Sequence, residues 1–272
     1  MRTWPRRWPV TAAAAWVLFA ALAAALALHG WRPFGFERAA IDWSTGHRPS
    51  GARHAAIAVT ALGTGAPPYV LALIAGAVLT RGARGDRGDR GDRGTRRDRG
   101  TRRDGGTRTR RRAAALLLTP LLWLIAGQLL RQALMHGFGR PRPSSAHWAT
   151  TVTGFAFPSG HSFTSAVCAG LLVLAVARRR PGWTRRAAAV AVPYAVMVGL
   201  SRVYLGVHWP LDVVGGWLLA AGWLACGAAV LTRVDRRPGD VTAPGGRTPA
   251  RRADPGDPTV PARRAALIPA VR

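Results

Sequence analysis

Val10–Leu28 reads VTAAAAWVLFAALAAALAL, an unbroken run without a charged side chain. An α-helix needs about 20 apolar residues to cross the hydrocarbon core of a bilayer, and this run has that length. A secretory signal peptide is the alternative, because Arg2, Arg6 and Arg7 precede the run. Signal-peptide cores are shorter, about 7–15 residues, so we favour a transmembrane helix that is retained.

Five further apolar stretches follow, and polar segments separate them. They cover residues 55–80, 113–130, 158–177, 187–205 and 211–232. Pro67 and Pro68 lie inside the first of the five, where they predict a kink in the helix. The sequence therefore predicts an all-α fold, a bundle of six transmembrane helices over residues 10–233.

The charged residues are uneven in kind and in position. The chain has 39 basic residues, all of them Arg, and 12 acidic ones, so its formal net charge is +27. Most Arg residues fall within residues 1–9, in the loops 81–112 and 178–186, and in the tail 234–272. Cytoplasmic segments of membrane proteins carry the excess of basic residues, so these four segments are predicted to be cytoplasmic. The expected location is the cell membrane, with several passes through it.

Two of the Arg-rich segments are too polar to contribute to a core. The loop 81–112 repeats Gly, Asp and Arg, and the tail 234–272 is rich in Arg and Pro, so both are predicted to be disordered. The simplest interpretation is a solvated linker and tail, and binding to anionic lipid head groups is the alternative. Nucleic-acid binding is not expected, because no aromatic residues alternate with the basic ones. The composition favours no particular oligomeric state.

Three polar motifs fall on the side of the membrane opposite the Arg-rich loops. Gly139–Pro143 (GRPRP) follows the third span, Pro158–His161 (PSGH) opens the fourth, and Ser201–Asp212 (SRVYLGVHWPLD) joins the fifth to the sixth. The predicted topology brings all three to the extracytoplasmic face. Ionisable residues at membrane depth are costly, so we interpret these motifs as parts of a functional site.

The first group of polar residues suits a phosphate. Arg142 and Arg202, with Arg140 as a further candidate, carry planar donor groups that match phosphate oxygens. Ser159 and Gly160 lie at a predicted helix start, where free N–H groups and the helix dipole favour an anion. Taken singly, an Arg-Pro pair is usually a turn and a Ser-Gly pair a helix cap. Their occurrence together on one membrane face favours phosphate chemistry.

A second group suits nucleophilic and acid–base chemistry. His161 and His208 can each act as nucleophile, acid or base. Asp212 follows His208 by four residues, so its carboxylate can accept the proton of one ring nitrogen and leave the other as a nucleophile. A structural hydrogen bond is the alternative for this pair. Metal binding by the three residues is disfavoured, because the nearby Arg residues would repel a cation.

The last two motifs resemble the signature of type 2 phosphatidic-acid phosphatases, which vanadium haloperoxidases and bacterial acid phosphatases share. The signature reads K-x6-R-P, then P-S-G-H, then S-R-x5-H-x3-D. The first block matches at Arg142 and Pro143, but Met135 stands where the family has Lys. The second block matches in full. The third block matches at every fixed position, namely Ser201, Arg202, His208 and Asp212.

The resemblance implies a role for each matched residue. His208 is the expected nucleophile and forms a phosphohistidine, Asp212 orients it, and His161 protonates the leaving oxygen and then activates water. No metal or other cofactor is implied. The expected substrate is a phosphate monoester or diphosphate of a lipid, such as undecaprenyl diphosphate, phosphatidic acid or phosphatidylglycerophosphate. The expected phosphate ligands are Arg142, Ser159, Gly160 and Arg202.

The missing Lys leaves a third cationic position to be filled. Arg131 lies one helical turn before Met135, and we predict that its long side chain supplies the charge, with His136 as a second candidate. An interfacial anchor is the alternative role for Arg131. Met135 also raises the alternative of a catalytically weak or inactive lipid-phosphate-binding membrane protein. A vanadate-dependent haloperoxidase is disfavoured by the six spans.

Overall fold

The computed structural model describes residues 8–88 and 102–235, and the regular secondary structure of this part of the chain is all helical, without a strand. The predicted all-α class is thereby confirmed. Two short 3-10 turns, η1 (Ser145–His147) and η2 (Pro181–Trp183), lie between helices. The α-helices are α1 (Trp8–Leu28), α2 (Gly35–Gly46), α3 (Ser50–Ala61), α4 (Ala66–Gly88), α5 (Arg102–Phe138), α6 (Gly160–Arg179), α7 (Thr184–Tyr204) and α8 (Pro210–Asp235).

The six predicted spans correspond to helices of the structure. Five helices, α1, α5, α6, α7 and α8, are long and apolar enough to cross a membrane by themselves. The sixth candidate is the pair α3 and α4, which meet at an angle of 46° and qualify together as one bent span. The described residues therefore form a multi-pass membrane protein with five or six spans.

The bend in the second span lies before the two prolines and not at them. The helix breaks between Ala61 and Ala66, at a turn in which Gly65 has a φ of +63°. Pro67 and Pro68 fall in the first turn of α4, where a missing N–H costs no intrahelical hydrogen bond. The prediction of a bend was right, but its assignment to the prolines was wrong.

The predicted loop 81–112 is helical at both of its ends. Helix α4 continues to Gly88, and α5 begins at Arg102. Arg is a favourable helix former, and extending an existing helix is easier than starting one, so both spans continue beyond their apolar parts. Residues 89–101 and the predicted tail from residue 236 lie outside the described part of the chain. Helix α2, by contrast, was not predicted.

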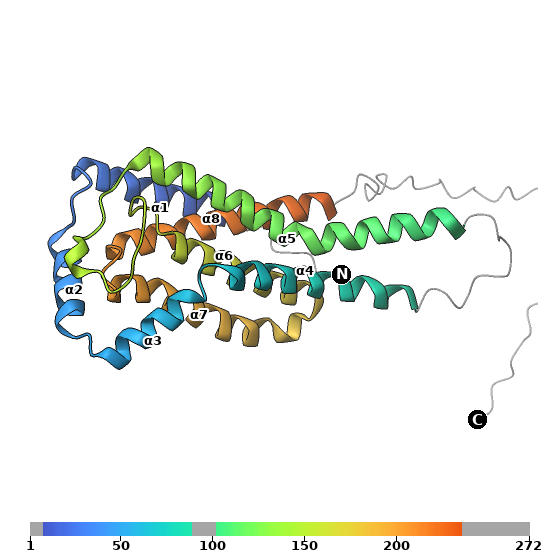
Figure 1. Ribbon diagram of the computed structural model, residues 1–272. Helices are drawn as coiled ribbons and strands as arrows, with labels where there is room; N and C mark the ends of the chain where they lie inside the picture. The colour runs from blue at the N-terminus through green and yellow to red at the C-terminus, as the bar shows by residue number, and fades with distance from the viewer. Residues whose placement is uncertain (1–7, 89–101, 236–272) are drawn as a thin grey trace, which may run out of the picture. The chain divides into compact units, whose positions relative to one another are not determined.

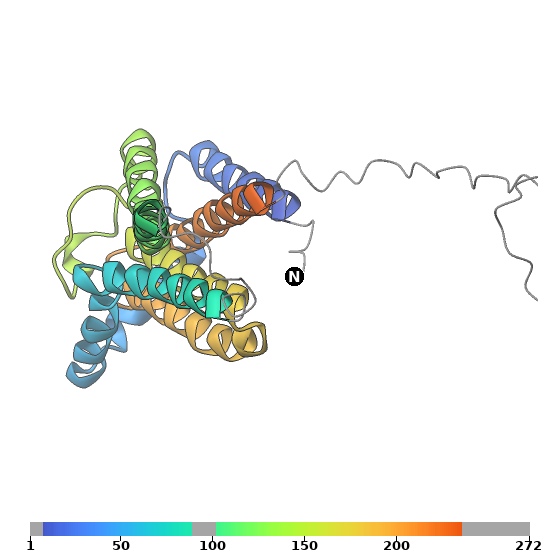
Figure 2. The ribbon, with the colours of Figure 1, turned by 90° about the vertical axis from the view of Figure 1, so that its right-hand side faces the viewer.

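Helix α6 lies in the middle of the bundle, as the end-on view in Figure 2 shows. It contacts α4, α5 and α7. Small residues allow close helix packing: a Cβ added to Gly76 of α4 would lie 2.1 Å from the Leu117 carbonyl oxygen of α5. The main core cluster includes Phe19, Leu26, Leu124, Phe157, Phe163, Val167 and Leu219.

The three polar motifs meet at one end of the bundle. Figure 1 shows that the long segment between α5 and α6, the short connection between α7 and α8, and helix α2 all lie at this end. Backbone hydrogen bonds join the first two of these segments, because the Ala149 N–H donates to the Leu205 carbonyl at 2.9 Å. The fold thus brings residues from distant parts of the sequence to one site.

Candidate active site

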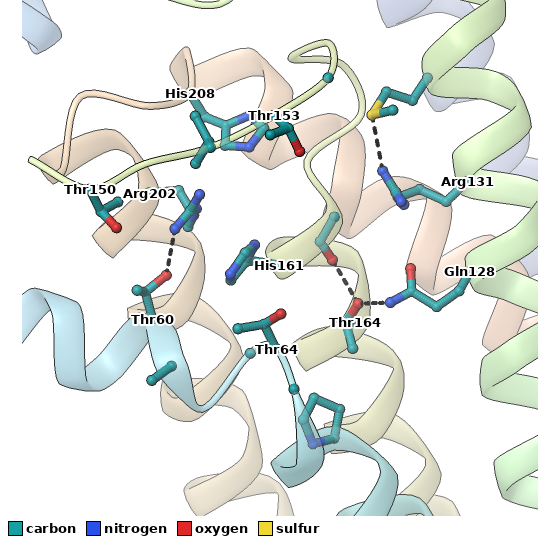
Figure 3. A pocket seen from close by; sticks show the side chains of 18 of the residues that line it. Thr60, Thr64, Gln128, Arg131, Thr150, Thr153, His161, Thr164, Arg202 and His208 are labelled. Atoms are coloured by element: carbon teal, nitrogen blue, oxygen red, sulfur yellow. Dashed lines mark hydrogen bonds between the residues drawn. The ribbon is translucent and has the colours of Figure 1, made fainter. Parts of the chain in front are cut away.

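A cavity of about 740 Å³ opens between the α3–α4 break, α5, the start of α6, α7 and the loop 150–154. Figure 3 shows His161 in the middle of this cavity, with Thr60, Arg131, Thr153, Arg202 and His208 among the side chains around it. Ser159 and Asp212, which were also predicted for the site, do not line the cavity and are fully buried. The predicted site residues that line it are Arg131, Arg142, Gly160, His161, Arg202 and His208.

The start of α6 forms the floor of the predicted phosphate site. Gly160 is the first residue of α6, so the N–H groups of its first turn have no partner within the helix. The Ser159 N–H donates to the Asp212 carbonyl at 3.0 Å, which fixes this helix start against α8. The Ser159 hydroxyl accepts a hydrogen bond from the Ser162 hydroxyl at 3.0 Å, which leaves its own O–H to donate.

His208 and Asp212 are held together by the local sequence Trp209-Pro210 between them. Pro210 opens α8, and the Asp212 carboxylate accepts the Trp209 N–H at 2.8 Å, as a residue at the third helical position commonly does. This places Oδ2 of Asp212 at 3.5 Å from Nδ1 of His208.

The other ring nitrogen of His208 faces a cation. Nη1 of Arg142 lies 2.8 Å from Nε2 of His208. A guanidinium can only donate, so Nε2 is the acceptor and the ring proton belongs on Nδ1, which faces Asp212. The geometry therefore presents the lone pair of Nε2 to Arg142, which lines the cavity.

Burial and the charges of Arg142 and Arg202 lower the pKa of His208 well below its usual range. Burial has the largest effect, because it disfavours the charged form of the ring. The ring is therefore neutral at neutral pH. Burial also lowers the pKa of Arg142 to about 10, so its guanidinium remains charged at neutral pH.

Arg142 is fixed by backbone carbonyl groups on two sides. Its Nε donates to the Gly154 carbonyl at 2.9 Å and its Nη2 to the Thr153 carbonyl at 3.0 Å. Its Nη1 also donates to the Val207 carbonyl at 2.8 Å. A guanidinium held in this way is preorganised to bind an anion beside His208.

Arg202 reaches the cavity from α7. Its side chain is buried, and Nη1 donates to the Thr60 hydroxyl at 3.0 Å, an interaction visible in Figure 3. Its Nε is buried without a hydrogen-bond partner, which leaves a donor for a ligand. Thr60 belongs to α3 and was not predicted, because nothing in its local sequence marks it.

Arg131 reaches the start of α6 from α5. A Cβ added to Gly160 would lie 3.3 Å from Cζ of Arg131, so the guanidinium lies directly against this glycine. Nη1 of Arg131 is 3.3 Å from Sδ of Met135, and Nη2 contacts the Gln132 side chain. Its Nε is buried without a hydrogen-bond partner. The position that lacks the family Lys therefore has a cation next to it.

Arg140 does not line the cavity, so its interpretation as a phosphate donor was wrong. Its side chain is fully buried, and its Nη1 and Nη2 donate to Asp212 at 2.6 Å and to Glu37 at 2.7 Å. Glu37 was not predicted for the site. One sequence signal could have revealed it: Glu37 is the only Glu in the chain.

The residues that the structure describes include no group of three or more His, Cys, Asp or Glu side chains arranged to hold a metal ion. The cavity lining combines three imidazoles, those of His136, His161 and His208, with three guanidinium groups. Such a set of donors suits an anion.

The fold and the cavity define a multi-pass membrane protein with an anion site that is lined by histidines and arginines. Residues 116–236 match the family model of the PAP2 superfamily. The match covers the second and third sequence motifs and the arginines of the first.

Named relatives agree with this family. The chain is 31% identical over 120 residues to an undecaprenyl-diphosphatase of Sulfolobus acidocaldarius, a match that covers 43% of this chain and 54% of the relative. It is 37% identical over 105 residues to phosphatidylglycerophosphatase B of Escherichia coli K12, covering 36% and 40%. The matches thus span about half the length of these curated relatives.

A solved structure shares the fold. The crystal structure of a transmembrane PAP2-type phosphatidylglycerolphosphate phosphatase from Bacillus subtilis superimposes with a TM-score of 0.63 at 24% sequence identity. The match covers 84% of this chain and 98% of that one. It supports the helical architecture described above.

Proposed function

We propose that this protein is a membrane phosphatase that hydrolyses a phosphate monoester or diphosphate of a lipid through a phosphohistidine intermediate on His208. The observation that carries the proposal is the geometry of His208. Its unprotonated Nε2 lies against Arg142, which lines the cavity, and its Nδ1 faces the buried carboxylate of Asp212. This is the arrangement of an activated histidine nucleophile.

In the first step, Nε2 of His208 attacks the phosphorus atom of the substrate. Arg142 leaves Nε2 and turns its donor to a phosphate oxygen. An N–P bond forms, the bond from phosphorus to the lipid oxygen breaks, and His161 gives its proton to that oxygen. The products of this step are the lipid alcohol, or a lipid monophosphate from a diphosphate, and the phosphohistidine.

In the second step, His161, now neutral, takes a proton from water. The resulting hydroxide attacks phosphorus, the P–N bond breaks, and inorganic phosphate leaves. Arg142, Arg202 and the N–H of Gly160 stabilise the oxygens in both transition states. Arg131 supplies the third positive charge. This chemistry uses only groups of the protein and water.

A lipid substrate fits the position of the cavity. The cavity lies where polar motifs meet the ends of apolar helices, so a phosphate can enter it while the attached chain stays in the bilayer. The distribution of Arg residues favours the extracytoplasmic side for this end of the bundle. The names of the relatives support undecaprenyl diphosphate and phosphatidylglycerophosphate as the first candidates.

The test is phosphate release by the purified protein in detergent, with undecaprenyl diphosphate, phosphatidic acid and phosphatidylglycerophosphate as substrates. We expect release from at least one lipid and none by the His208→Ala variant. A folded wild-type protein that binds these lipids without hydrolysing them would refute the proposal and favour a catalytically weak or inactive lipid-phosphate-binding protein.

A further inference from the structure

Asp212 belongs to a fully buried group of three charged side chains. Arg140 bridges Asp212 and Glu37, with N–O distances of 2.6 and 2.7 Å, and none of the three side chains is exposed. A buried ion group contributes little net stability, because the loss of hydration offsets the attraction between the charges. Stability by itself therefore does not explain why the chain keeps its only Glu at this place.

The charges of this group matter for His208. The Asp212 carboxylate faces Arg140 through Oδ1 and His208 through Oδ2. If Arg140 had no other partner, its positive charge would cancel most of the field that Asp212 exerts on the ring. Glu37 contributes a second negative charge to Arg140, so the three groups together carry one net negative charge beside His208.

We propose that Glu37 is a positioning residue of the hydrolytic site, which shares the Arg140 guanidinium with Asp212 and so preserves the negative charge that orients and activates His208. The inference rests on the proposed function. When Nε2 bonds to phosphorus while Nδ1 keeps its proton, the ring becomes positively charged. The net negative charge of the buried group stabilises that state.

Glu37 lies outside the cavity, so it can affect the reaction only through the residues that it contacts. It belongs to α2, and its Oε2 also accepts the Phe34 N–H at 3.0 Å at the start of that helix. Its Oε1 accepts the Leu211 N–H at 3.1 Å in the first turn of α8. These bonds fix the carboxylate against the helix that carries Asp212. A change in the charge of Glu37 therefore alters the electrostatic potential at His208, although no contact with the substrate is lost.

The test is the pH dependence of kcat/KM for lipid phosphate hydrolysis, since its acid limb reports protonation of the free enzyme's nucleophile. The groups that face His208 remain the same in every variant, so a shift reports the charge of the Glu37–Arg140 pair. These groups are Asp212 on α8, Arg142 on the segment between α5 and α6, Arg202 on α7, Arg131 on α5 and His161 on α6.

For Glu37→Gln we expect kcat to fall by about tenfold or more, because a less basic imidazole is a weaker nucleophile and is less well oriented. The acid limb should move to lower pH by about half a unit or more, because the uncompensated Arg140 disfavours the protonated ring. The matched control is Asp42→Asn, which removes one negative charge from an exposed position on the same helix. Its kcat and the pH of its acid limb should equal those of the wild type.

Glu37→Gln leaves Arg140 with one partner and can fail to fold, so a second variant is needed. Glu37→Gln combined with Arg140→Gln removes both charges, which keeps the net charge beside His208 at its wild-type value. We expect its acid limb to return to the wild-type position.

Three outcomes contradict the inference. The first is a folded Glu37→Gln variant whose acid limb lies at the same pH as that of the wild type. The second is a double variant whose acid limb lies at a lower pH than that of the wild type. Either result, with an active wild type and an inactive His208→Ala variant, overturns the role of Glu37 and leaves the proposed function standing. The third is a folded wild type that hydrolyses no lipid phosphate, which overturns both.

Discussion

Nη1 of Arg142 lies 2.8 Å from Nε2 of His208, so the cation that is proposed to bind phosphate also occupies the free ring nitrogen of the nucleophile. A guanidinium has no acceptor, so the contact requires an unprotonated Nε2. Before substrate enters, Arg142 thus keeps His208 in its reactive form. When the phosphate arrives, the same donor can turn to an equatorial oxygen.

The first prediction concerns pH. Burial and the charge of Arg142 lower the pKa of His208, so kcat/KM of the wild type should hold as the pH falls below about 6.5, the ordinary value for His. Arg142→Gln removes a repelling charge and raises this pKa, so the acid limb should move to higher pH. Arg142→Lys keeps the positive charge, so the acid limb of this variant should stay at the wild-type pH, although its phosphate binding weakens. If the limb of Arg142→Gln stayed at the wild-type pH, the electrostatic role of Arg142 would be refuted.

The second prediction concerns the cation at the start of α6. Arg131→Gln should lower kcat/KM by about tenfold or more, because a charged donor to the phosphate is lost. The matched control is Arg111→Gln, an exposed position on the same helix, which should keep wild-type kinetics.

Met135 offers a rescue of that variant. Its Sδ lies 3.3 Å from Nη1 of Arg131, so a Lys at position 135 would bring its ammonium group to the same place. Met135→Lys should therefore restore most of the activity of Arg131→Gln. An Arg131→Gln enzyme with unchanged kinetics would show that Arg131 is only an anchor at the membrane interface.

The third prediction concerns Gly160. A Cβ at this position would lie 3.3 Å from the Arg131 guanidinium, at the end of a flexible side chain that can shift. Gly160→Ala should therefore fold normally but crowd the phosphate site and lower kcat/KM by about tenfold or more. Gly137→Ala on α5, where a Cβ meets nothing within 4 Å, is the control. Equal kinetics for the two variants would contradict a close approach of phosphate to Gly160.

The fourth prediction concerns topology. A membrane-impermeant thiol reagent should label a Ser145→Cys variant in intact cells and a Gly182→Cys variant only after permeabilisation. Both positions are exposed, and they lie in connections at opposite ends of α6. The chain without an added Cys is the control, since Cys168 is buried and Cys226 half-buried. The reverse labelling pattern would move the cavity to the cytoplasmic side.

Much of the fold was predictable because apolar run length is a strong signal for a membrane helix. The runs at 10–28 and 113–130, for example, both lie within single helices of the structure. The bend in the second span was misplaced because Pro67 and Pro68 are a stronger local signal than Gly65, although two prolines in a first turn disturb nothing.

The cavity residues were predictable because spacing carries their chemistry, as with His208 and Asp212 four residues apart. The residues that support the cavity residues from outside could not be predicted. Glu37 and Arg140 are separated by 103 positions, and Thr60 and Arg202 by 142, so no local pattern connects them. Arg140 was misjudged because an Arg-Pro pair beside another Arg-Pro pair looks the same whether its side chain faces a ligand or a buried carboxylate.

The most direct test of the central claim is to trap the intermediate. Purified protein is mixed with a lipid substrate that carries a radiolabelled phosphate, quenched under alkaline conditions during turnover, and digested for mass spectrometry. We predict label on His208 of the wild type, at acid-labile phosphohistidine, and none in His208→Ala, which should also lose turnover by at least about 100-fold. Phosphate release by a folded His208→Ala variant at the wild-type rate would contradict the account.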